Sequence, residues 1–259
     1  MPRTARRKSQ SGIYHIMLRG INKQTIFFDN EDMARLHSTL LRFKKTSDFQ
    51  LYAYCFMPNH IHLLIREQHE PISRIMQKIS SSFVFWYNQK YERCGHLFQE
   101  RYKSEVVEDD QYFLALLRYI HQNPLKPGMV QKVEEYRWSS MKEYLNATIL
   151  VDTDFPLNMF GSDKQKARGR FLSFMNEMNS DRCRIDDEFE DDLDPVRDIK
   201  DYLQARGISK IDELLALKRD RRNAIITELK SIEGVSCKDI ADLTGLSKST
   251  ISRISSKKP

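Results

Sequence analysis

The stretch QLYAYCFMPNHIHLLI, residues 50–65, contains two short apolar runs separated by a turn. The runs at 50–56 and 61–65 are rich in the aromatic and β-branched residues that strands favour. Met57-Pro58-Asn59 between them is typical of a turn. The stretch therefore predicts a strand, a turn and a second strand.

Segments on both sides of this stretch alternate between strand and helix patterns. We expect further strands at 12–19 and 103–107, a helix from Asn30 to about Lys45, a helix that opens with Pro71 at its first position, and a helix that starts at Asp109 or Asp110 and ends by Asn123, before Pro124. The helix after Pro71 carries apolar residues at spacings of three and four, namely Ile72, Ile75, Met76, Ile79, Phe83 and Trp86. Pairs of strands interleaved with helices indicate an α+β domain with a ferredoxin-like antiparallel sheet.

His60 and His62 lie two residues apart in the second of the central strands. Side chains alternate along a strand, so both imidazoles point to one face while Ile61 and Leu63 point to the other. Two adjacent imidazoles suit a metal site. Taken alone, the same pattern also describes an ordinary surface or core pair of histidines.

Tyr119 and Asn123 lie four residues apart in a predicted helix and therefore face the same way. A hydroxyl and an amide oxygen would project together from its last turn. A second interpretation stays open, in which Tyr119 is a core residue beside Leu116 and Leu117 and Asn123 only ends the helix.

Composition narrows the class of protein. The chain has 259 residues, 42 Lys+Arg, 36 Asp+Glu and a net charge of +6. No window approaches the ~18 apolar residues of a membrane span, and Met1–Lys8 lacks the apolar core of a signal peptide. The four widely spaced cysteines favour free thiols. We expect a cytoplasmic, nucleoid-associated protein with no membrane partner.

Charge is distributed unevenly along the chain. Residues 181–194 hold eight acids and two bases, whereas 195–259 carry a net +5 and 1–180 a net +7. The acidic run predicts a solvated linker, or else a segment that competes with nucleic acid for a basic surface. We therefore expect a first domain at 1–146, a partly helical connector at 147–194 and an all-α domain at 195–259.

The last of these regions contains a helix-turn-helix pattern at 236–255. Ser236 and Asp239 form a capping-box start, Gly245 lies at the turn, and Ser247 can cap a second helix over Lys248–Ser255. That helix would present four polar residues to a DNA groove, namely Lys248, Ser249, Thr250 and Arg253. A generic helical hairpin is the alternative.

Five separated motifs resemble one known family. They are Gly12-x-Tyr14-His15 with Arg19-Gly20, the residues 53–64, the residues 97–104, Arg118–Pro124 and Trp138–Ser140. In this order they resemble the IS200/IS605-like transposases with a single nucleophilic tyrosine, most of all the branch associated with REP hairpins. The resemblance spans roughly residues 10–146.

The resemblance implies an HUH-type endonuclease and strand transferase that acts on single-stranded and hairpin DNA through a 5′-phosphotyrosine. Tyr119 matches the nucleophile, and His60, His62 and Asn123 match the ligands of Mg²⁺ or Mn²⁺. A neutral phenol is a weak nucleophile, so a cation that offsets charge on the phosphate fits this chemistry. Relatives include dimers and monomers, and the large C-terminal region favours a monomer here.

Basic and aromatic residues near these motifs are candidates for DNA contact. Phosphate contacts are expected from Arg3, Arg6, Arg7, Lys8, Arg19, Lys23, Arg101 and Lys103, and base stacking from Tyr14, Tyr102 or Trp86, although Trp86 also fits the core. Contact with duplex DNA is expected through the C-terminal domain. Two other functions stay open at this point: a DNA-binding regulator that does not use the chemistry, and a hydrolase that uses activated water.

Overall fold

A computed structural model of the chain describes residues 6–99, 101–179, 181, 183, 185, 195–232 and 235–254. The chain divides into two compact units, Met1–Asp186 and Asp187–Pro259, and each is described here by itself. Arg3 and most of the acidic run fall outside the described residues.

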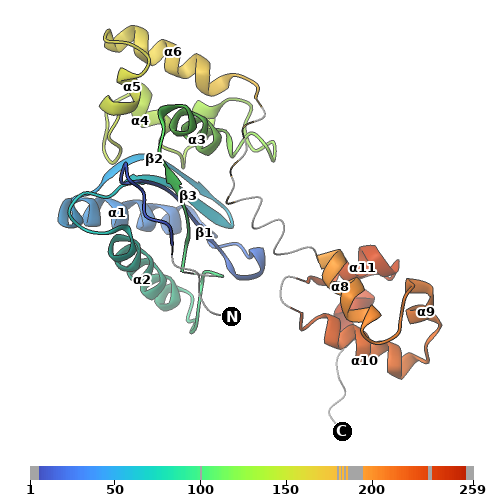
Figure 1. Ribbon diagram of the computed structural model, residues 1–259. Coiled ribbons are helices and arrows are strands. Elements are labelled where there is room, and N and C mark those ends of the chain that lie inside the picture. The colour runs from blue at the N-terminus through green and yellow to red at the C-terminus, as the bar shows by residue number, and fades with distance from the viewer. Residues whose placement is uncertain are drawn as a thin grey trace. The chain divides into compact units, whose positions relative to one another are not determined.

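The first unit is built on a four-stranded antiparallel sheet in the order β2-β3-β1-β4 (Figure 1). Its strands are β1 (Ile13–Arg19), β2 (Gln50–Met57), β3 (His60–Arg66) and β4 (Lys103–Val107). Helix α1 (Asn30–Ser47) joins β1 to β2, and α2 (Ile72–Lys90) joins β3 to β4. This βαββαβ order confirms the ferredoxin-like fold expected from the sequence.

Local sequence sets the ends of both helices. The Asp29 side chain accepts a hydrogen bond from the backbone N–H of Asp32, and the Asp32 side chain accepts one in return, so a capping box begins α1. Pro71 is the N-cap of α2 and not its first helical residue, because its ψ of 145° is still extended. The apolar spacing in α2 predicts that Trp86 lies on the buried face. In the structure Trp86 is half-buried, and the neighbouring Tyr87 is fully buried.

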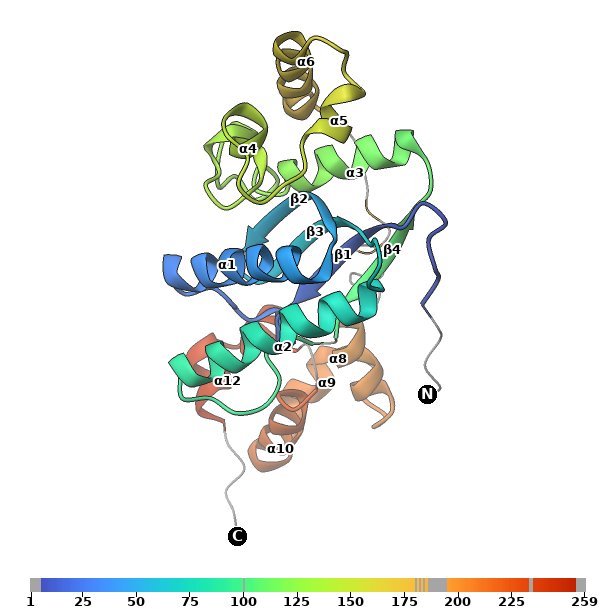
Figure 2. The same cartoon turned by 90° about the vertical axis from the view of Figure 1, so that its left-hand side faces the viewer.

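Helices α1 and α2 cover one face of the sheet (Figures 1 and 2). The core between them contains Ile16, Leu18, Leu36, Leu40, Ile61, Leu63, Ile75, Ile79 and Phe83, all 2% exposed or less. Because neighbouring residues of a strand point to opposite faces, the residues between these strand positions, His60 and His62 among them, face the other side.

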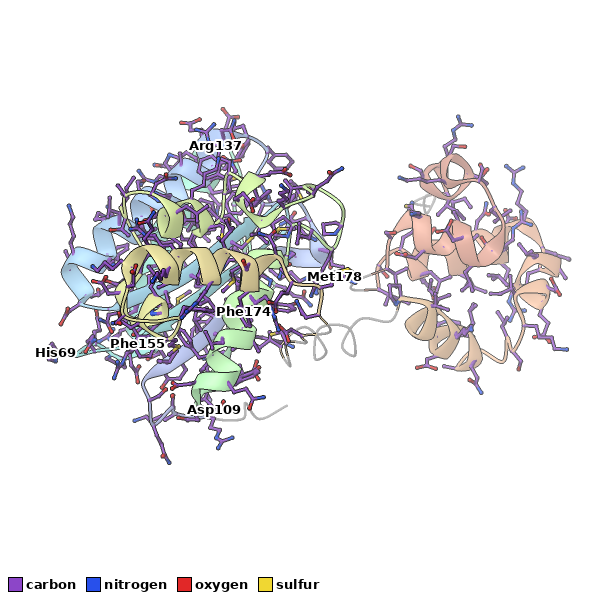
Figure 3. The ribbon with its side chains drawn as sticks, turned by 90° about the horizontal axis from the view of Figure 1, so that it is seen from above. His69, Asp109, Arg137, Phe155, Phe174 and Met178 are labelled. Carbon is purple, nitrogen blue, oxygen red and sulfur yellow. The ribbon has the colours of Figure 1, made fainter. Side chains whose placement is uncertain are left out.

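Helix α3 (Asp110–Gln122) lies on that other face, and Asp109 caps its start (Figure 3). Three short helices pack around it, α4 (Met141–Leu145), α5 (Asp154–Asn158) and α6 (Lys164–Asn176). The Tyr144 and Phe171 rings stack with centroids 4.3 Å apart. Residues 141–179, which include much of the expected connector at 147–194, therefore largely build a second layer on the sheet.

The Trp138–Ser140 motif joins this layer to the edge of the sheet. The backbone N–H of Phe56 donates to the Trp138 carbonyl at 2.9 Å, and the N–H of Ser140 donates to the Tyr54 carbonyl at 3.0 Å. Both contacts pair the motif with the free edge of β2, so its backbone groups extend the ladder by two bonds.

The second unit is helical throughout its described part. Its helices are α8 (Pro195–Gln204), α9 (Ile211–Ala216), α10 (Arg219–Leu229), α11 (Cys237–Thr244) and α12 (Lys248–Arg253), around a core that includes Ile199, Leu214, Ile226, Ile240 and Ile251. Across both units, none of the helices made by described residues is long and apolar enough to cross a membrane.

Candidate active site

The strand register gathers the functional side chains on the face of the sheet that α3 covers. His60 lies opposite Arg19, His62 lies opposite Met17, and Met17 in turn pairs with Lys103. Directly paired residues of antiparallel strands project to the same side. Arg19 and Lys103, expected to contact DNA, therefore share a face with both histidines.

Asn123 completes the link between the sheet and α3. It is the C-cap of α3, and its side-chain oxygen lies 3.3 Å from Nε2 of His60. The other ring nitrogen of His60, Nδ1, lies 2.7 Å from Oδ1 of Asn59 in the turn before β3. The structure thus brings Asn123 to His60 and His62, from which it is 63 and 61 residues away in the sequence.

Tyr119 lies on α3 directly above the histidines. Its ring meets those of His62 and His15 edge-on, with centroids 5.8 Å and 6.4 Å apart. Nζ of Lys126 lies 3.7 Å from the centre of the Tyr119 ring. Tyr119 is 3% exposed, as a core tyrosine would be, yet the groups around it are imidazoles and an ammonium, which distinguish it from the apolar core.

Burial keeps the imidazoles of this face neutral. The pKa of His60 is lowered to about 4, chiefly by desolvation and to a smaller extent by the charges of Arg19 and Lys126, against a hydrogen bond to Asn123 that raises it. Desolvation also holds the pKa of His62 well below its usual range. Neutral imidazole is the form that binds metal ions.

Two residues of this cluster each carry a polar atom that is left without a partner. Nε2 of His62 and Nδ2 of Asn123 are buried and have no hydrogen-bond partner among the described residues. Buried polar atoms normally have partners, so an orphaned imidazole nitrogen beside an amide indicates a place for a ligand. The donor set of two imidazoles and one amide oxygen fits Mg²⁺ or Mn²⁺ and also softer ions.

The space next to this cluster is open and basic. A pocket of about 620 Å³ is lined by Lys23, Asn59, His60, Asn123 and Lys126, together with five other residues of the turn and the segment after α3. Lys23 is exposed in the 3-10 turn η1 (Ile21–Lys23). A phosphate in this pocket would lie beside two ammonium groups and the histidine cluster.

Other basic residues of the first unit that were expected to contact DNA do not line this pocket. Arg101 is exposed and lines a second pocket with Arg6 and Tyr102. The Arg6 guanidinium already covers the Tyr102 ring at 4.0 Å, so that ring is not available for stacking on a base. Lys103 is half-buried on β4. In the second unit, Lys248, Ser249, Thr250 and Arg253 are all exposed on α12, while Ile251 between them is buried.

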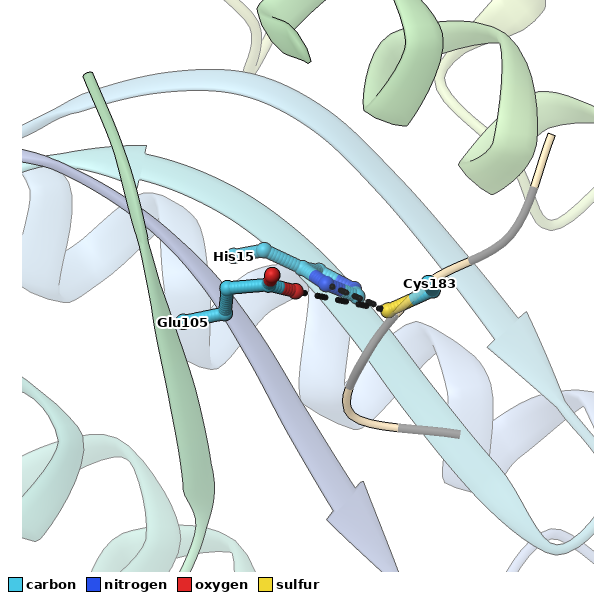
Figure 4. Close-up of side chains that lie close together, drawn as sticks. All are labelled: His15, Glu105 and Cys183. Atoms are coloured by element: carbon cyan, nitrogen blue, oxygen red, sulfur yellow. Dashed lines mark hydrogen bonds between the residues drawn. The ribbon is translucent and has the colours of Figure 1, made fainter. Parts of the chain in front are cut away.

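Three residues around the site had no role in the sequence interpretation: Glu105, Cys183 and Lys126. His15 was noticed only as part of a motif. His15 and Glu105 are paired in the register of β1 and β4, and Cys183 lies against both (Figure 4). His15, Glu105 and Cys183 offer donor atoms within 4.8 Å of one another, a spacing at which a metal ion is conceivable. Strand alternation points His15 to the same face as His62, but no sequence signal indicates Cys183.

The start of the acidic run is part of the first unit, contrary to the expectation of a solvated linker. Asp181 accepts a hydrogen bond from Nε of Arg118 at 2.7 Å. Cys183 and Ile185 are 1% and 2% exposed. The expectation failed because these two apolar side chains, which lie among acidic neighbours in the sequence, are buried, with Cys183 in contact with His15 and Glu105 of the sheet.

Comparisons with known proteins relate the first unit to one family. Residues 8–123 match the family described as Transposase IS200 like. The chain is 29% identical over 133 residues to a protein of Haemophilus influenzae assigned as a REP-associated tyrosine transposase, an alignment that covers 47% of this chain and 72% of that relative. It is 22% identical over 109 residues to the REP-associated tyrosine transposase of Escherichia coli, covering 40% of this chain and 62% of the relative.

A solved structure of a REP-associated tyrosine transposase bound to a REP hairpin is also similar, with a TM-score of 0.49 and 16% identity over 60% of this chain and 96% of that one. The family match at residues 8–123 contains the sheet, both histidines, Tyr119 and Asn123. Through these residues the chain is similar to the IS200-like transposases, and its resemblance to the REP-associated tyrosine branch is confirmed.

Proposed function

We propose that this protein cleaves and rejoins single-stranded DNA at hairpins, with Tyr119 as the nucleophile and a divalent cation held by His60, His62 and Asn123. The observation that carries the proposal is the edge-on contact of the Tyr119 ring with His62, whose Nε2 is orphaned, together with the contact between His60 and Asn123. A nucleophile, a ligand set and a basic pocket meet at one place.

The reaction is a transesterification at phosphorus. A bond forms between the Tyr119 oxygen and phosphorus while the bond from phosphorus to the 3′-oxygen breaks. The phenol loses its proton, and the 3′-oxygen leaves as a hydroxyl after gaining one. The 5′-phosphotyrosine stores the bond energy, so a 3′-hydroxyl can later rejoin the strand without ATP.

Each residue of the site has a distinct task in this scheme. When bound, the cation polarises a phosphate oxygen and offsets the negative charge of the transition state. Helix α3 fixes Tyr119 relative to the ligand set because Asn123, one of the proposed ligands, is the C-cap of the same helix. Lys126 and Lys23 contribute positive charge at the pocket that would receive the scissile phosphate.

The test uses labelled hairpin DNA with a single-stranded flank, purified protein and Mn²⁺. Wild type should form a covalent protein–DNA adduct that survives denaturation, and Tyr119→Phe should form none. Tyr112→Phe is the matched control, since Tyr112 lies on the same helix at a distance of two turns and should leave the adduct intact.

Two other outcomes would each replace the proposal. Binding of the hairpin without any cleavage by wild type would favour the DNA-binding regulator. Cleavage that persists in Tyr119→Phe would favour a hydrolase that uses activated water.

We further propose that α11 and α12 form a helix-turn-helix that binds duplex DNA. Ser236 and Asp239 form the expected capping box, Gly245 takes the left-handed φ of +71° at the turn, and Ser247 caps α12. The double variant Lys248→Ala/Arg253→Ala should weaken duplex binding and lower its salt dependence while single-strand cleavage stays unchanged. Equal loss of both activities would contradict this assignment.

A further inference from the structure

A buried contact between two imidazoles lies directly beneath the proposed metal site. Nε2 of His15 is 3.0 Å from Nδ1 of His62, and the two rings are stacked with centroids 5.2 Å apart. Both side chains are fully buried. Of the two nitrogens of His62, one is therefore committed to His15, and Nε2 is left to face the ligand position.

The chain of contacts continues past His15. Its other nitrogen, Nδ1, lies 3.2 Å from Sγ of Cys183, and that sulfur lies 3.8 Å from Oε2 of Glu105 (Figure 4). Cys183 is 1% exposed and Glu105 is 9% exposed. Four side chains from β3, β1, the segment after α6 and β4 thus form one continuous buried row.

Two proton arrangements are compatible with this row. In the first, Nδ1–H of His62 donates to His15, Nδ1–H of His15 donates to Cys183, and the thiol donates to the Glu105 carboxylate. In the second, Nε2–H of His15 donates to Nδ1 of His62, the thiol donates to Nδ1 of His15 in place of the Glu105 carboxylate, and the hydrogen of His62 sits on Nε2. That atom has no partner among the described residues, so the second arrangement buries an unpaired N–H there, whereas the first presents a lone pair that can bind a cation.

We propose that Cys183 is a positioning residue which, through His15 and Glu105, holds His62 in the tautomer whose Nε2 lone pair faces the metal site. The inference rests on the metal site of the proposed function. It extends a familiar arrangement, in which a carboxylate or carbonyl fixes the tautomer of a ligating histidine, by two further hydrogen bonds.

A metal ion bound by the row itself would have the opposite effect. An ion on Nδ1 of His15 forces the remaining hydrogen of that ring onto Nε2, where it must donate to Nδ1 of His62. His62 would then carry its hydrogen on Nε2 and could not be a ligand there. The row therefore serves either as a relay or as a second metal site, and only the relay supports the proposed chemistry.

The position of Cys183 is fixed by its neighbours in the chain. Arg118, the residue before Tyr119, pairs with Asp181 at 2.7 Å, and Ile185 is buried two residues after Cys183. Cys183 lies 60 residues beyond the end of the family match at residue 123. The relay thus makes the tautomer of His62 depend on a segment outside the part shared with the family.

The first measurement is the tautomer of His62 in metal-free full-length protein, from long-range ¹H–¹⁵N NMR correlations assigned with a His62→Gln sample. Wild type should show the hydrogen on Nδ1. Cys183→Ala removes the acceptor for His15 and should move the hydrogen of His62 at least partly to Nε2. Cys183→Ser keeps a donor and an acceptor and should restore the wild-type signal.

The second measurement is Mn²⁺ affinity, followed by electron paramagnetic resonance. Cys183→Ala should weaken binding about 10-fold, as loss of a positioning partner typically does. Cys183→Ser should stay within about 3-fold of wild type. Ile185→Ala is the matched control, because it perturbs the packing of the same segment without touching the relay, and it should also bind like wild type.

Three results would overturn the relay. They are a wild-type His62 with its hydrogen on Nε2, equal Mn²⁺ affinity in Cys183→Ala and wild type, or stoichiometric zinc in purified protein that disappears in Cys183→Ser. If wild type binds no Mn²⁺ at all, the proposed function fails instead, and the NMR measurement still decides the relay.

Discussion

The stability of the first unit should fall steeply between pH 7.5 and pH 5.5. Three histidines on or beside the sheet, His15, His62 and His121, are fully buried and His60 is half-buried, and desolvation lowers the pKa of each. The pKa falls to about 3 for His15 and to about 4 for His60 and His121, and it lies well below the usual range for His62. In the unfolded chain each would titrate near ~6.5.

The sign follows from proton binding. Below pH ~6.5 these histidines bind protons in the unfolded chain but not in the folded unit, so acid favours unfolding. The stability is fully present above the unfolded pKa and is lost as the pH falls from there toward the lowered pKa values. Between pH 7.5 and 5.5 each group contributes ~1.4 kcal/mol, and four groups together about 5 kcal/mol.

Both tryptophans of the chain, Trp86 and Trp138, belong to the first unit, so tryptophan fluorescence reports its unfolding alone. Urea titrations in EDTA at half-unit steps of pH give the free energy of unfolding. His121→Gln removes one buried titrating group and should reduce the drop by about a quarter. His69→Gln is the control, since the His69 side chain is 90% exposed and lies at the periphery of the unit (Figure 3), and it should leave the drop unchanged.

A free energy of unfolding that changes by less than about 1 kcal/mol over this range would refute the reasoning. It would mean that the imidazoles are not held neutral by burial. The argument for a preformed neutral ligand set would then fail with it.

Three further results are expected at other positions. Burial alone would raise the pKa of Glu143, but hydrogen bonds from His37 and from the backbone N–H groups of 149–151 lower it to about 2. Glu143→Gln should therefore lower the free energy of unfolding at pH 7 by about 3 kcal/mol, as measured by urea titration. This difference between wild type and variant should shrink as the pH falls from 4.5 toward about 2. Gly20→Ala should destabilise the first unit by about 1–3 kcal/mol, because a Cβ would lie 2.4 Å from the Gln24 carbonyl oxygen. Gly169→Ala is the control and should not destabilise the unit, because a Cβ at that position meets nothing within 4 Å. Equal stability of the two variants would contradict this reasoning. Asn123→Ala should weaken Mn²⁺ binding about 10-fold by paramagnetic resonance, and unchanged affinity would remove Asn123 from the ligand set.

Local patterns in the sequence were sufficient to predict the sheet and the core of the candidate site. The alternation around His60 and His62 gave their common face, and the proline after Asn123 gave the end of α3 at the residue where it occurs. Such features depend on neighbours within a few residues. The same holds for the capping box at Ser236 and Asp239.

Contacts between distant segments could not be read in this way. Cys183 and His15 are 168 residues apart, and no sequence pattern near either residue predicts that they are in contact. The eight acids at 181–194 predicted a solvated linker, but Cys183 and Ile185 at the start of this run are buried. The layer formed by residues 141–179 was missed for a similar reason: its short helices are stabilised by packing on α3 and not by their own periodicity.

The most direct test of the account is the identity of the atom that carries the DNA. Wild-type protein is incubated with Mn²⁺ and a hairpin labelled at its 3′ end, the adduct is trimmed with nuclease, and its peptides are analysed by mass spectrometry. The account predicts a nucleotide attached through its 5′-phosphate to Tyr119, with the 3′ label retained in the adduct before trimming. A nucleotide on any other residue, or attachment through a 3′-phosphate, would contradict it.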